Sequence, residues 1–185
     1  MMGKPTAGEL IAARGQRIRD VIGPSLHVLL CGINPSLYSA AVRHHFARPG
    51  NRFWPALALA GITPRKFSPA EDRDLLPLGY GITNVVARAT ATAAELSAIE
   101  LEHGAALLTR KVLRFAPSLL AVLGITAYRA GFQRPRAVLG LQRETIGEAA
   151  IWVLPNPSGL NAHVQVADLA VALREMHDHA LAPRG

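Results

Sequence analysis

Runs of mostly apolar residues, each about as long as a strand, recur along this chain. They predict strands at 26–31, 81–86, 118–123 and 151–154. The first run is almost wholly apolar, as expected for a strand that is buried on both faces. The stretches between these runs are longer and carry apolar residues at helical spacing, so we expect strands and helices to alternate.

A capping box begins the first predicted helix, because Thr6 is followed at the required spacing by Glu9. Apolar residues then fall on one side of residues 9–21, and Gly23-Pro24 ends the helix. Three further helices are expected at 51–60, 97–115 and 164–181.

Local signals support the helix at 51–60 and mark one more. Asn51 is a candidate N-cap, and Gly61 ends the same helix. Ser68 is another candidate N-cap, since a proline follows it at the first helical position. The helix at 97–115 is expected to form despite Gly104 in its interior.

Helices that alternate with short apolar strands predict an α/β protein with three layers, in which helices cover both faces of a central, mostly parallel sheet. The 185 residues suit a single compact domain over 1–185, and the chain shows no repeat, linker or low-complexity tract. Sheets of this kind bind ligands at the carboxyl ends of their strands. The residues at those ends are therefore the most informative ones.

Amide side chains recur at the predicted strand ends, where Asp, Glu and Lys are missing. The ends read Gly32-Ile33-Asn34-Pro35, Gly81-Ile82-Thr83-Asn84, Gly124-Ile125-Thr126 and Pro155-Asn156-Pro157-Ser158-Gly159. At any single end, these residue types are also explained by turn formation. Their recurrence indicates a shared polar crevice without charge, which suits a neutral heteroaromatic group better than a cation.

The net charge of +7 favours a negatively charged partner. Many of the cations fall in two stretches without acidic residues, which predict a positive face for phosphates. These cations are Arg43, Arg48, Arg52, Arg65 and Lys66 in the first stretch, and Arg110, Lys111, Arg114, Arg129, Arg134, Arg136 and Arg143 in the second. Solvated faces with acids nearby in space are the alternative.

Several chemistries lack their sequence signature. The chain has no phosphate-binding loop and no dinucleotide fingerprint. Cys31 is the only cysteine, so neither a disulfide within the chain nor an iron–sulfur site is expected. Adjacent His44 and His45 have no ligand partner at helical spacing, so we expect a surface or hydrogen-bonded role for them and no bound metal.

Five motifs, in their order and separations, closely resemble the mismatch-specific uracil-DNA glycosylase and thymine-DNA glycosylase family. They are Gly32-Ile33-Asn34-Pro35, His44-His45-Phe46, the segment 49–54, the segment 81–88 and the segment 154–160. The similarity extends from about Val28 to Asn161. It implies the uracil-DNA glycosylase α/β/α fold and hydrolysis of the N-glycosidic bond of a mismatched uracil, without metal or cofactor.

The resemblance implies that Asn34 is catalytic. An amide is no general base at neutral pH, but its oxygen can orient the water that attacks the sugar. Asn84, at the neighbouring strand end, is expected to help position Asn34 or that water. A turn cap before Pro35 is the alternative role for Asn34.

Base-binding positions follow from the same resemblance. Phe46 matches the aromatic residue that stacks on the extruded base, and backbone near Ile33 and Phe46 reads the base edge. Ser39 matches a position beside the 5-carbon of the base. Ser36 stands where the family usually has glycine, so it is strained if the backbone there needs positive φ and otherwise narrows the pocket.

Beyond the last strand, Leu160 matches the wedge that fills the gap left by an extruded base. Residues around it are expected to hold the wedge and contact phosphate, namely Asn156, Ser158, Gly159, Asn161 and His163. A core leucine at the start of the final helix is the alternative for Leu160. Glu95 is a candidate second carboxylate near the pocket. The alternative is that it lies at a helix N-terminus and has a structural role there.

The function expected from these features is a monofunctional DNA glycosylase that removes uracil from G·U mismatches and so initiates base excision repair. Ethenocytosine, thymine and deaminated purines are further candidate substrates. The alternatives are a module of the same fold that binds damaged DNA without cutting, and a glycosidase of free nucleosides. We expect a monomer that binds double-stranded DNA. The chain shows neither a signal-peptide pattern nor a membrane-spanning apolar run, so it is expected in the cytoplasm, associated with the nucleoid through DNA.

Overall fold

A computed structural model describes residues 4–160 and 164–182 of the chain. The sheet strands are β1 Val28–Gly32, β2 Tyr80–Asn84, β3 Leu119–Leu123, β4 Gly140–Ile146 and β5 Ala149–Leu154. The α-helices are α1 Ala7–Ala12, α2 Leu37–Val42, α3 Phe53–Leu59, α4 Ala98–Phe115, α5 Ile125–Gly131 and α6 Val166–Leu181. Two 3-10 segments complete the elements, η1 Pro69–Leu78 and η2 Ala93–Glu95.

The strands form one five-stranded sheet in the order β2-β1-β3-β5-β4. Neighbouring strands β2, β1, β3 and β5 run parallel, and only β4 is antiparallel to its neighbour β5. All five residues of β1 and of β3 are buried, as expected for central strands covered on both faces.

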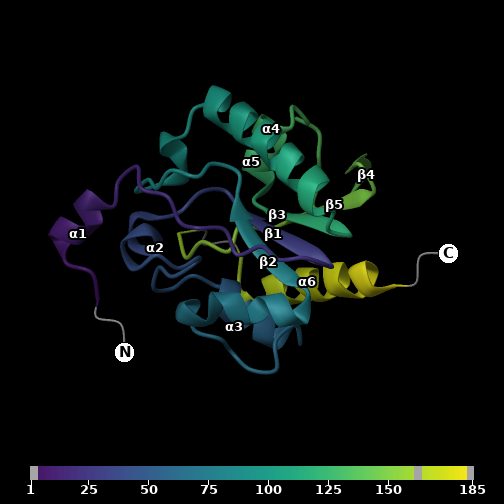
Figure 1. Cartoon of the computed structure of the whole chain (residues 1–185), viewed down its shortest axis with the longest axis horizontal. Helices are drawn as coiled ribbons and strands as arrows, with labels where there is room; N and C mark the ends of the chain where they lie inside the picture. The colour runs from purple at the N-terminus through teal and green to yellow at the C-terminus, as the bar shows by residue number, and fades with distance from the viewer. Residues whose placement is uncertain (1–3, 161–163, 183–185) are drawn as a thin grey trace.

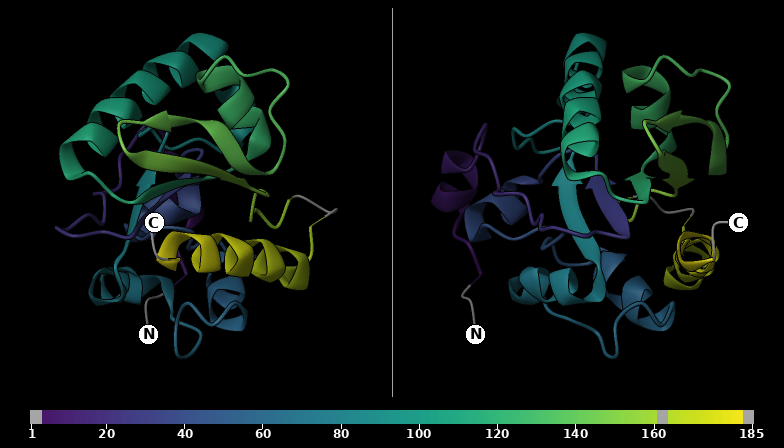
Figure 2. Two further views of the ribbon diagram at one scale, coloured as in Figure 1. Left: turned by 90° about the vertical axis from the view of Figure 1, so that its right-hand side faces the viewer. Right: turned by 45° about the vertical axis from the view of Figure 1, so that its right-hand side comes forward.

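Helices cover both faces of this sheet (Figures 1 and 2). One apolar core lies between the sheet and α3 and α6, where Phe53, Leu57 and Leu173 are buried. A second core lies on the opposite face against α4 and α5, where Leu108 and Tyr128 are buried. The predicted three-layer α/β/α architecture with a mostly parallel sheet is therefore confirmed.

The predicted helix over 9–21 is wrong beyond its first turns. The capping box of Thr6 and Glu9 forms, but α1 ends at Ala12 and the following backbone turns at Gly15, whose φ is 75°. The segment then runs extended beside β2, where Val21 pairs with Ile82 in antiparallel orientation. The two backbone hydrogen bonds between Val21 and Ile82 satisfy polar groups at the edge of β2, which a helix over these residues would leave unpaired.

Three elements escaped the sequence pattern. Helices α2 and α5 are short, and each begins at a polar strand end where the sequence pattern predicted no helix. Strand β4 has exposed and half-buried residues in alternation, so it lacks the apolar run used to find the other strands. Helix α3 begins one residue later than expected, with Arg52 as N-cap, although the Asn51 side chain still accepts a hydrogen bond from the Phe53 N–H.

Gly104 lies in the interior of α4, where the helix approaches the carboxyl end of β2. A Cβ on Gly104 would lie 2.4 Å from the Val85 carbonyl oxygen. The glycine therefore permits a close packing of helix on sheet that any larger residue prevents. Among the described residues, no helix is long and apolar enough to cross a membrane.

Candidate functional site

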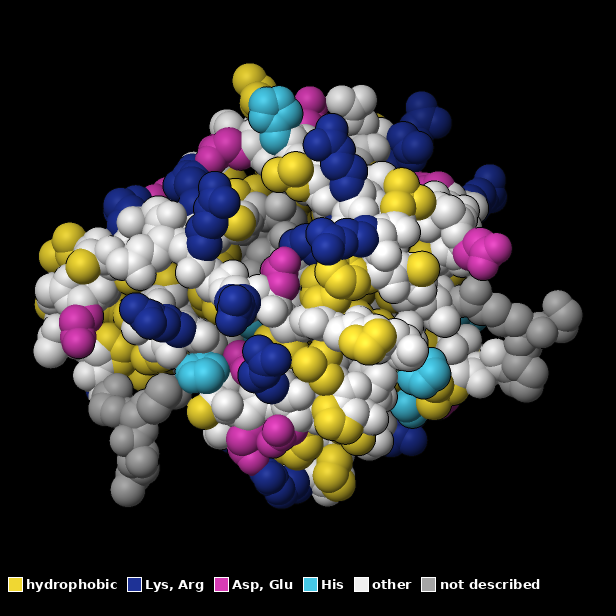
Figure 3. Space-filling model, viewed as in Figure 1, with side chains coloured by type: hydrophobic (Ala, Val, Ile, Leu, Met, Phe, Trp, Pro, Cys, Tyr) yellow, Lys and Arg dark blue, Asp and Glu magenta, His cyan; other side chains and the backbone are white. Residues whose placement is uncertain are grey.

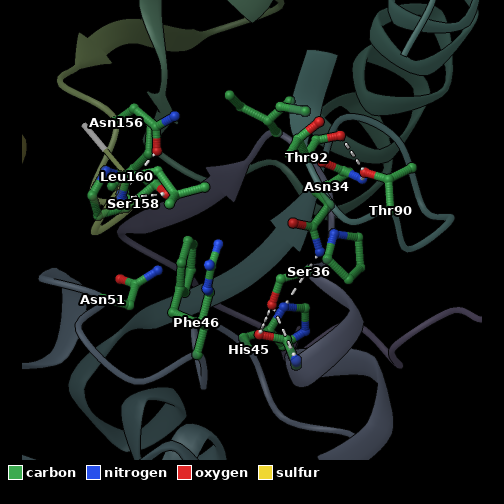
Figure 4. Close-up of a pocket in the computed structure, with 18 of the residues that line it drawn as sticks. Asn34, Ser36, His45, Phe46, Asn51, Thr90, Thr92, Asn156, Ser158 and Leu160 are labelled. Atoms are coloured by element: carbon green, nitrogen blue, oxygen red, sulfur yellow. Dashed lines mark hydrogen bonds between the residues drawn. The ribbon is translucent and has the colours of Figure 1, made fainter. Parts of the chain in front are cut away.

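A pocket opens at the carboxyl ends of β1 and β2, with a volume of about 700 Å³ including its open mouth. Most of the predicted site residues line it, namely Ile33, Asn34, Ser36, Ser39, Phe46, Asn84, Asn156, Ser158 and Leu160. Asn156, Ser158 and Leu160 lie on one side of the pocket, and Asn34 lies on the other beside Thr90 and Thr92 (Figure 4). Asn161 and His163 lie outside the described residues.

The Asn34 side chain is held in one orientation by its amide nitrogen. Nδ2 donates to the Arg88 carbonyl oxygen at 3.0 Å and to Thr90 Oγ1 at 2.7 Å. Thr90 Oγ1 in turn donates to the Thr92 carbonyl oxygen at 2.7 Å, so it can only accept from Asn34. Both amide hydrogens are thus engaged, and Oδ1 remains as the acceptor available to the pocket.

Asn84 is oriented by a buried histidine. His45 Nε2 lies 3.1 Å from the Arg19 carbonyl oxygen, so this nitrogen carries the proton. Burial lowers the pKa of His45, which keeps the ring neutral and its Nδ1 an acceptor. Asn84 Nδ2 lies 3.4 Å from that Nδ1. The Asn84 oxygen consequently points the other way, toward Gly32, where an added Cβ would lie 2.7 Å from it.

Phe46 stands on a buried aromatic stack. Its ring stacks on Phe53, with centroids 3.9 Å apart and an interplanar angle of 21°. The Phe46 backbone has a φ of 53°, a conformation unusual for a residue with a side chain. Neighbouring bonds hold it there, because Ser39 Oγ accepts from the Ala47 N–H and Trp54 Nε1 donates to the His45 carbonyl.

Ser36 is not strained. Its φ is −70°, an ordinary extended conformation, and its side chain caps α2 by accepting from the Ser39 N–H. Ser36 Oγ also lies 3.0 Å from Ser39 Oγ. The serine therefore stabilises the turn that follows Asn34 and adds a hydroxyl to the pocket wall.

Leu160 is exposed over 61% of its surface and lies at the pocket rim, not in the core. The loop that carries it is built by local side-chain bonds. Asn156 Oδ1 accepts from the Ser158 N–H at 3.0 Å, and Ser158 Oγ accepts from the Leu160 N–H at 3.3 Å. Gly159 does not line the pocket but packs against Gly50.

No carboxylate lines the pocket among the described residues, and Arg48 is the cation in its wall. Glu95, the candidate second carboxylate, caps η2 and pairs with Arg14, whose hydrogen bond lowers the Glu95 pKa. Its structural role at a helix N-terminus was the alternative interpretation. His44 Nδ1 lies 3.1 Å from Asp72 Oδ2. No group of potential metal ligands occurs in the described part of the chain.

Some cations of the two basic stretches lie close to carboxylates in the folded structure. Arg65 pairs with Glu71, Lys111 with Asp20 and Arg134 with Glu144. Dark blue cationic side chains are spread over the face seen in Figure 3 instead of gathering in one patch. The alternative of solvated, paired faces thus holds for part of each stretch.

Sequence reasoning missed Thr90 altogether, and it treated His45 and Asn51 as structural. Thr90 is 1% exposed although its surroundings in the sequence are alanines and threonines without any apolar run. Its importance arises from pairing across the fold, since Asn34 is far from it in the chain. The only local signal for Thr90 is a hydroxyl side chain within a run of small residues that follows the second strand end.

The three-layer α/β/α fold thus carries a pocket at the carboxyl ends of parallel strands, where such folds bind their ligands, and amide side chains but no carboxylate line it among the described residues. Residues 20–176 match the model of the Uracil DNA glycosylase superfamily. This match spans most of the chain, so the protein belongs to that superfamily. Membership implies a DNA substrate and the chemistry of an N-glycosyl hydrolase.

A solved structure has the same fold. It is the solution NMR structure of a candidate uracil DNA glycosylase from Methanosarcina acetivorans, with a TM-score of 0.59 and 16% sequence identity. The alignment covers 88% of this chain and 98% of that chain. At this identity the likeness concerns the fold alone.

Proposed function

We propose that this protein is a monofunctional DNA glycosylase that removes uracil from G·U mismatches, as the mismatch-specific uracil-DNA and thymine-DNA glycosylases do. The Asn34 amide carries the proposal. Two hydrogen bonds fix its nitrogen, and its oxygen accepts none from the described residues. An oriented neutral acceptor in a pocket whose described residues include no carboxylate suits a water nucleophile and a neutral base better than a cationic ligand or a proton abstraction.

In the proposed reaction the target nucleotide leaves the duplex and its base stacks on Phe46. Stacking contributes about 1–3 kcal/mol per base and tolerates several bases. The C1′–N1 bond then breaks, its electron pair stays on the uracil ring, and the sugar becomes cationic in character. Water held by Asn34 Oδ1 attacks C1′ and releases a proton to solvent, and the departing uracil anion takes up a proton from solvent at N1. The products are an abasic site and free uracil.

Mismatch preference follows from the cost of extrusion. Moving a base out of the stack costs a few kcal/mol, and the cost is lower for a mispaired base. A G·U pair is therefore a better substrate than a sound pair. Ethenocytosine, thymine and deaminated purines remain candidate substrates of the same pocket. In this proposal the protein binds double-stranded DNA as a monomer with a single catalytic domain.

We expect Asn34→Ala to lower the single-turnover rate of uracil release from a G·U duplex by about a hundredfold or more, because the water loses its orienting group. Binding to the same duplex should stay nearly unchanged, since the oxygen contacts water and not the DNA backbone. Base release is measured as alkali-labile abasic sites in labelled duplex. Undiminished release would contradict the role of Asn34.

One assay separates the alternatives. Labelled duplexes with uracil, thymine or hypoxanthine opposite guanine are incubated with the protein beside free deoxyuridine. A non-catalytic module binds these duplexes and forms no abasic sites. A nucleoside glycosidase releases uracil from deoxyuridine, whereas the proposed enzyme acts on the duplexes alone.

A further inference from the structure

The wedge loop, residues 156–160, rests on the turn that precedes α3. Arg52 in that turn makes two hydrogen bonds to it. The Arg52 backbone N–H donates to the Pro157 carbonyl at 2.9 Å, and Arg52 Nη1 donates to the Ser158 carbonyl at 2.8 Å. Arg52 forms no ion pair with an acid among the described residues, so these carbonyls are its partners within the protein.

The same two segments approach so closely that only glycine fits. A Cβ on Gly159 would lie 2.6 Å from the Gly50 carbonyl oxygen and 3.1 Å from its carbon. The obstacle is backbone, which cannot rotate away as a side chain does. The wedge loop is thus seated on residues 50–52 through contacts on both sides of Ser158.

The other side of this turn supports the pocket floor. Phe53, which follows Arg52 directly, is fully buried and carries the stacked Phe46 ring. Asn51 Oδ1 accepts from the Phe53 N–H at 2.9 Å and fixes the start of α3. One short turn therefore connects the ring on which a base would stack with the loop that carries Leu160.

We propose that Arg52 is a positioning residue that holds Leu160 at a fixed place relative to the Phe46 ring. The inference rests on the proposed function, in which Leu160 fills the gap left by the extruded base. Leu160 is mostly exposed, so its position depends on the loop that carries it. A loop seated before DNA binds loses less conformational entropy when the wedge enters the stack.

This role differs from a direct phosphate contact in what it changes. A positioning residue matters where the wedge must displace a paired base, and it matters little where the base is already unpaired. A phosphate contact weakens binding to both kinds of DNA and lowers the salt dependence of binding by about one counterion. The two roles can therefore be separated with one set of variants.

The experiment uses the full chain and two labelled substrates, a duplex with a G·U mismatch and the same duplex with uracil in an unpaired bubble. The variants are Arg52→Ala, Gly159→Ala and Leu160→Ala. Arg174→Ala on α6 is the matched control, since this exposed arginine packs against Gly61, away from the wedge loop. Single-turnover release, binding at several salt concentrations and thermal melting are measured for each.

We expect Arg52→Ala to lower the rate on the G·U duplex about tenfold relative to the bubble, which is the effect of losing a hydrogen bond from a charged donor. Gly159→Ala should shift the same ratio in the same direction, because its Cβ would push the loop away from the Gly50 carbonyl. Leu160→Ala should show the same selectivity, and Arg174→Ala should show none. The salt dependence of Arg52→Ala should match that of the wild type. Gly159→Ala keeps the test independent of charge.

Equal losses of Arg52→Ala on both substrates, a reduced salt dependence, or an unchanged duplex-to-bubble ratio would each overturn the positioning role. Failure of the proposed function looks different. In that case the wild type releases uracil from neither substrate, whatever stands at position 52.

Discussion

At the scale of single residues, hydrogen bonds decide which way the pocket amides face. Thr90 leaves the Asn34 oxygen toward the pocket, and neutral His45 turns the Asn84 nitrogen toward itself. An Asn side chain that could rotate freely would present its NH2 donor and its oxygen acceptor to the pocket alternately. These buried partners therefore set the chemical character of a pocket whose own side chains carry little charge.

The His45 ring makes this arrangement sensitive to pH. Burial holds the pKa of His45 below its ordinary value of 6.5, so the unfolded chain takes up a proton there before the folded chain does. Stability from this residue is full above about 6.5 and is lost as the pH falls through the lower pKa of the folded state. Protonation would also place two donors, His45 Nδ1 and Asn84 Nδ2, against each other.

We expect the midpoint of thermal unfolding to fall as the pH is lowered below 6.5, and His45→Gln to show a weaker decline over the same range. Melting curves recorded at several pH values check this. The comparison between the two proteins isolates His45 from His44 and His177. Parallel curves for the two proteins would show that another group dominates.

At the scale of elements, sequence periodicity located the central strands and the long helices α4 and α6, because burial on a known face leaves a regular apolar pattern. It failed where contacts across the fold outweighed local preference. Residues 16–21 became an extended cover for the edge of β2, and the half-exposed β4 gave no apolar run. The pattern also placed Asn34, Asn84 and Asn156 at the carboxyl ends of strands, where the structure has them lining one pocket.

Helix α4 offers a test of the contact at Gly104. Helix propensity alone favours alanine over glycine by about 1 kcal/mol. At Gly104, however, the added Cβ would strike the Val85 carbonyl, so we expect Gly104→Ala to lower the free energy of unfolding by about 1–3 kcal/mol.

Gly8→Ala in α1 is the matched control, because a Cβ there meets nothing within 4 Å. It should leave stability unchanged or raise it slightly. Denaturant unfolding of both variants checks the pair. A gain in stability from Gly104→Ala would mean that α4 does not pack as closely on β2 as this contact requires.

At the scale of the whole molecule, the excess of positive charge governs the approach of DNA. Some arginines are neutralised by nearby carboxylates, as Arg134 is by Glu144. Arg48 forms no ion pair with an acid within the described ranges and lies in the pocket wall. Only cations without a carboxylate partner, such as Arg48, release counterions from DNA in full when they contact a phosphate.

We expect the logarithm of the affinity for duplex DNA to fall linearly with the logarithm of the salt concentration. Arg48→Ala should reduce the slope by about one unit, whereas Arg134→Ala should change it little. Titration of labelled duplex at several salt concentrations measures both. A flat dependence for the wild type would contradict a binding mode based on phosphate contacts.

The sequence by itself determined the layered α/β class and the polar strand ends, since burial and turn formation leave local patterns. It also carried the resemblance that pointed to the Uracil DNA glycosylase superfamily. Only the tertiary structure decided the orientation of the amides and the seat of the wedge loop. Thr90 on Asn34, His45 on Asn84 and Arg52 on Ser158 are contacts between segments distant in the chain, and such pairing has no local signature.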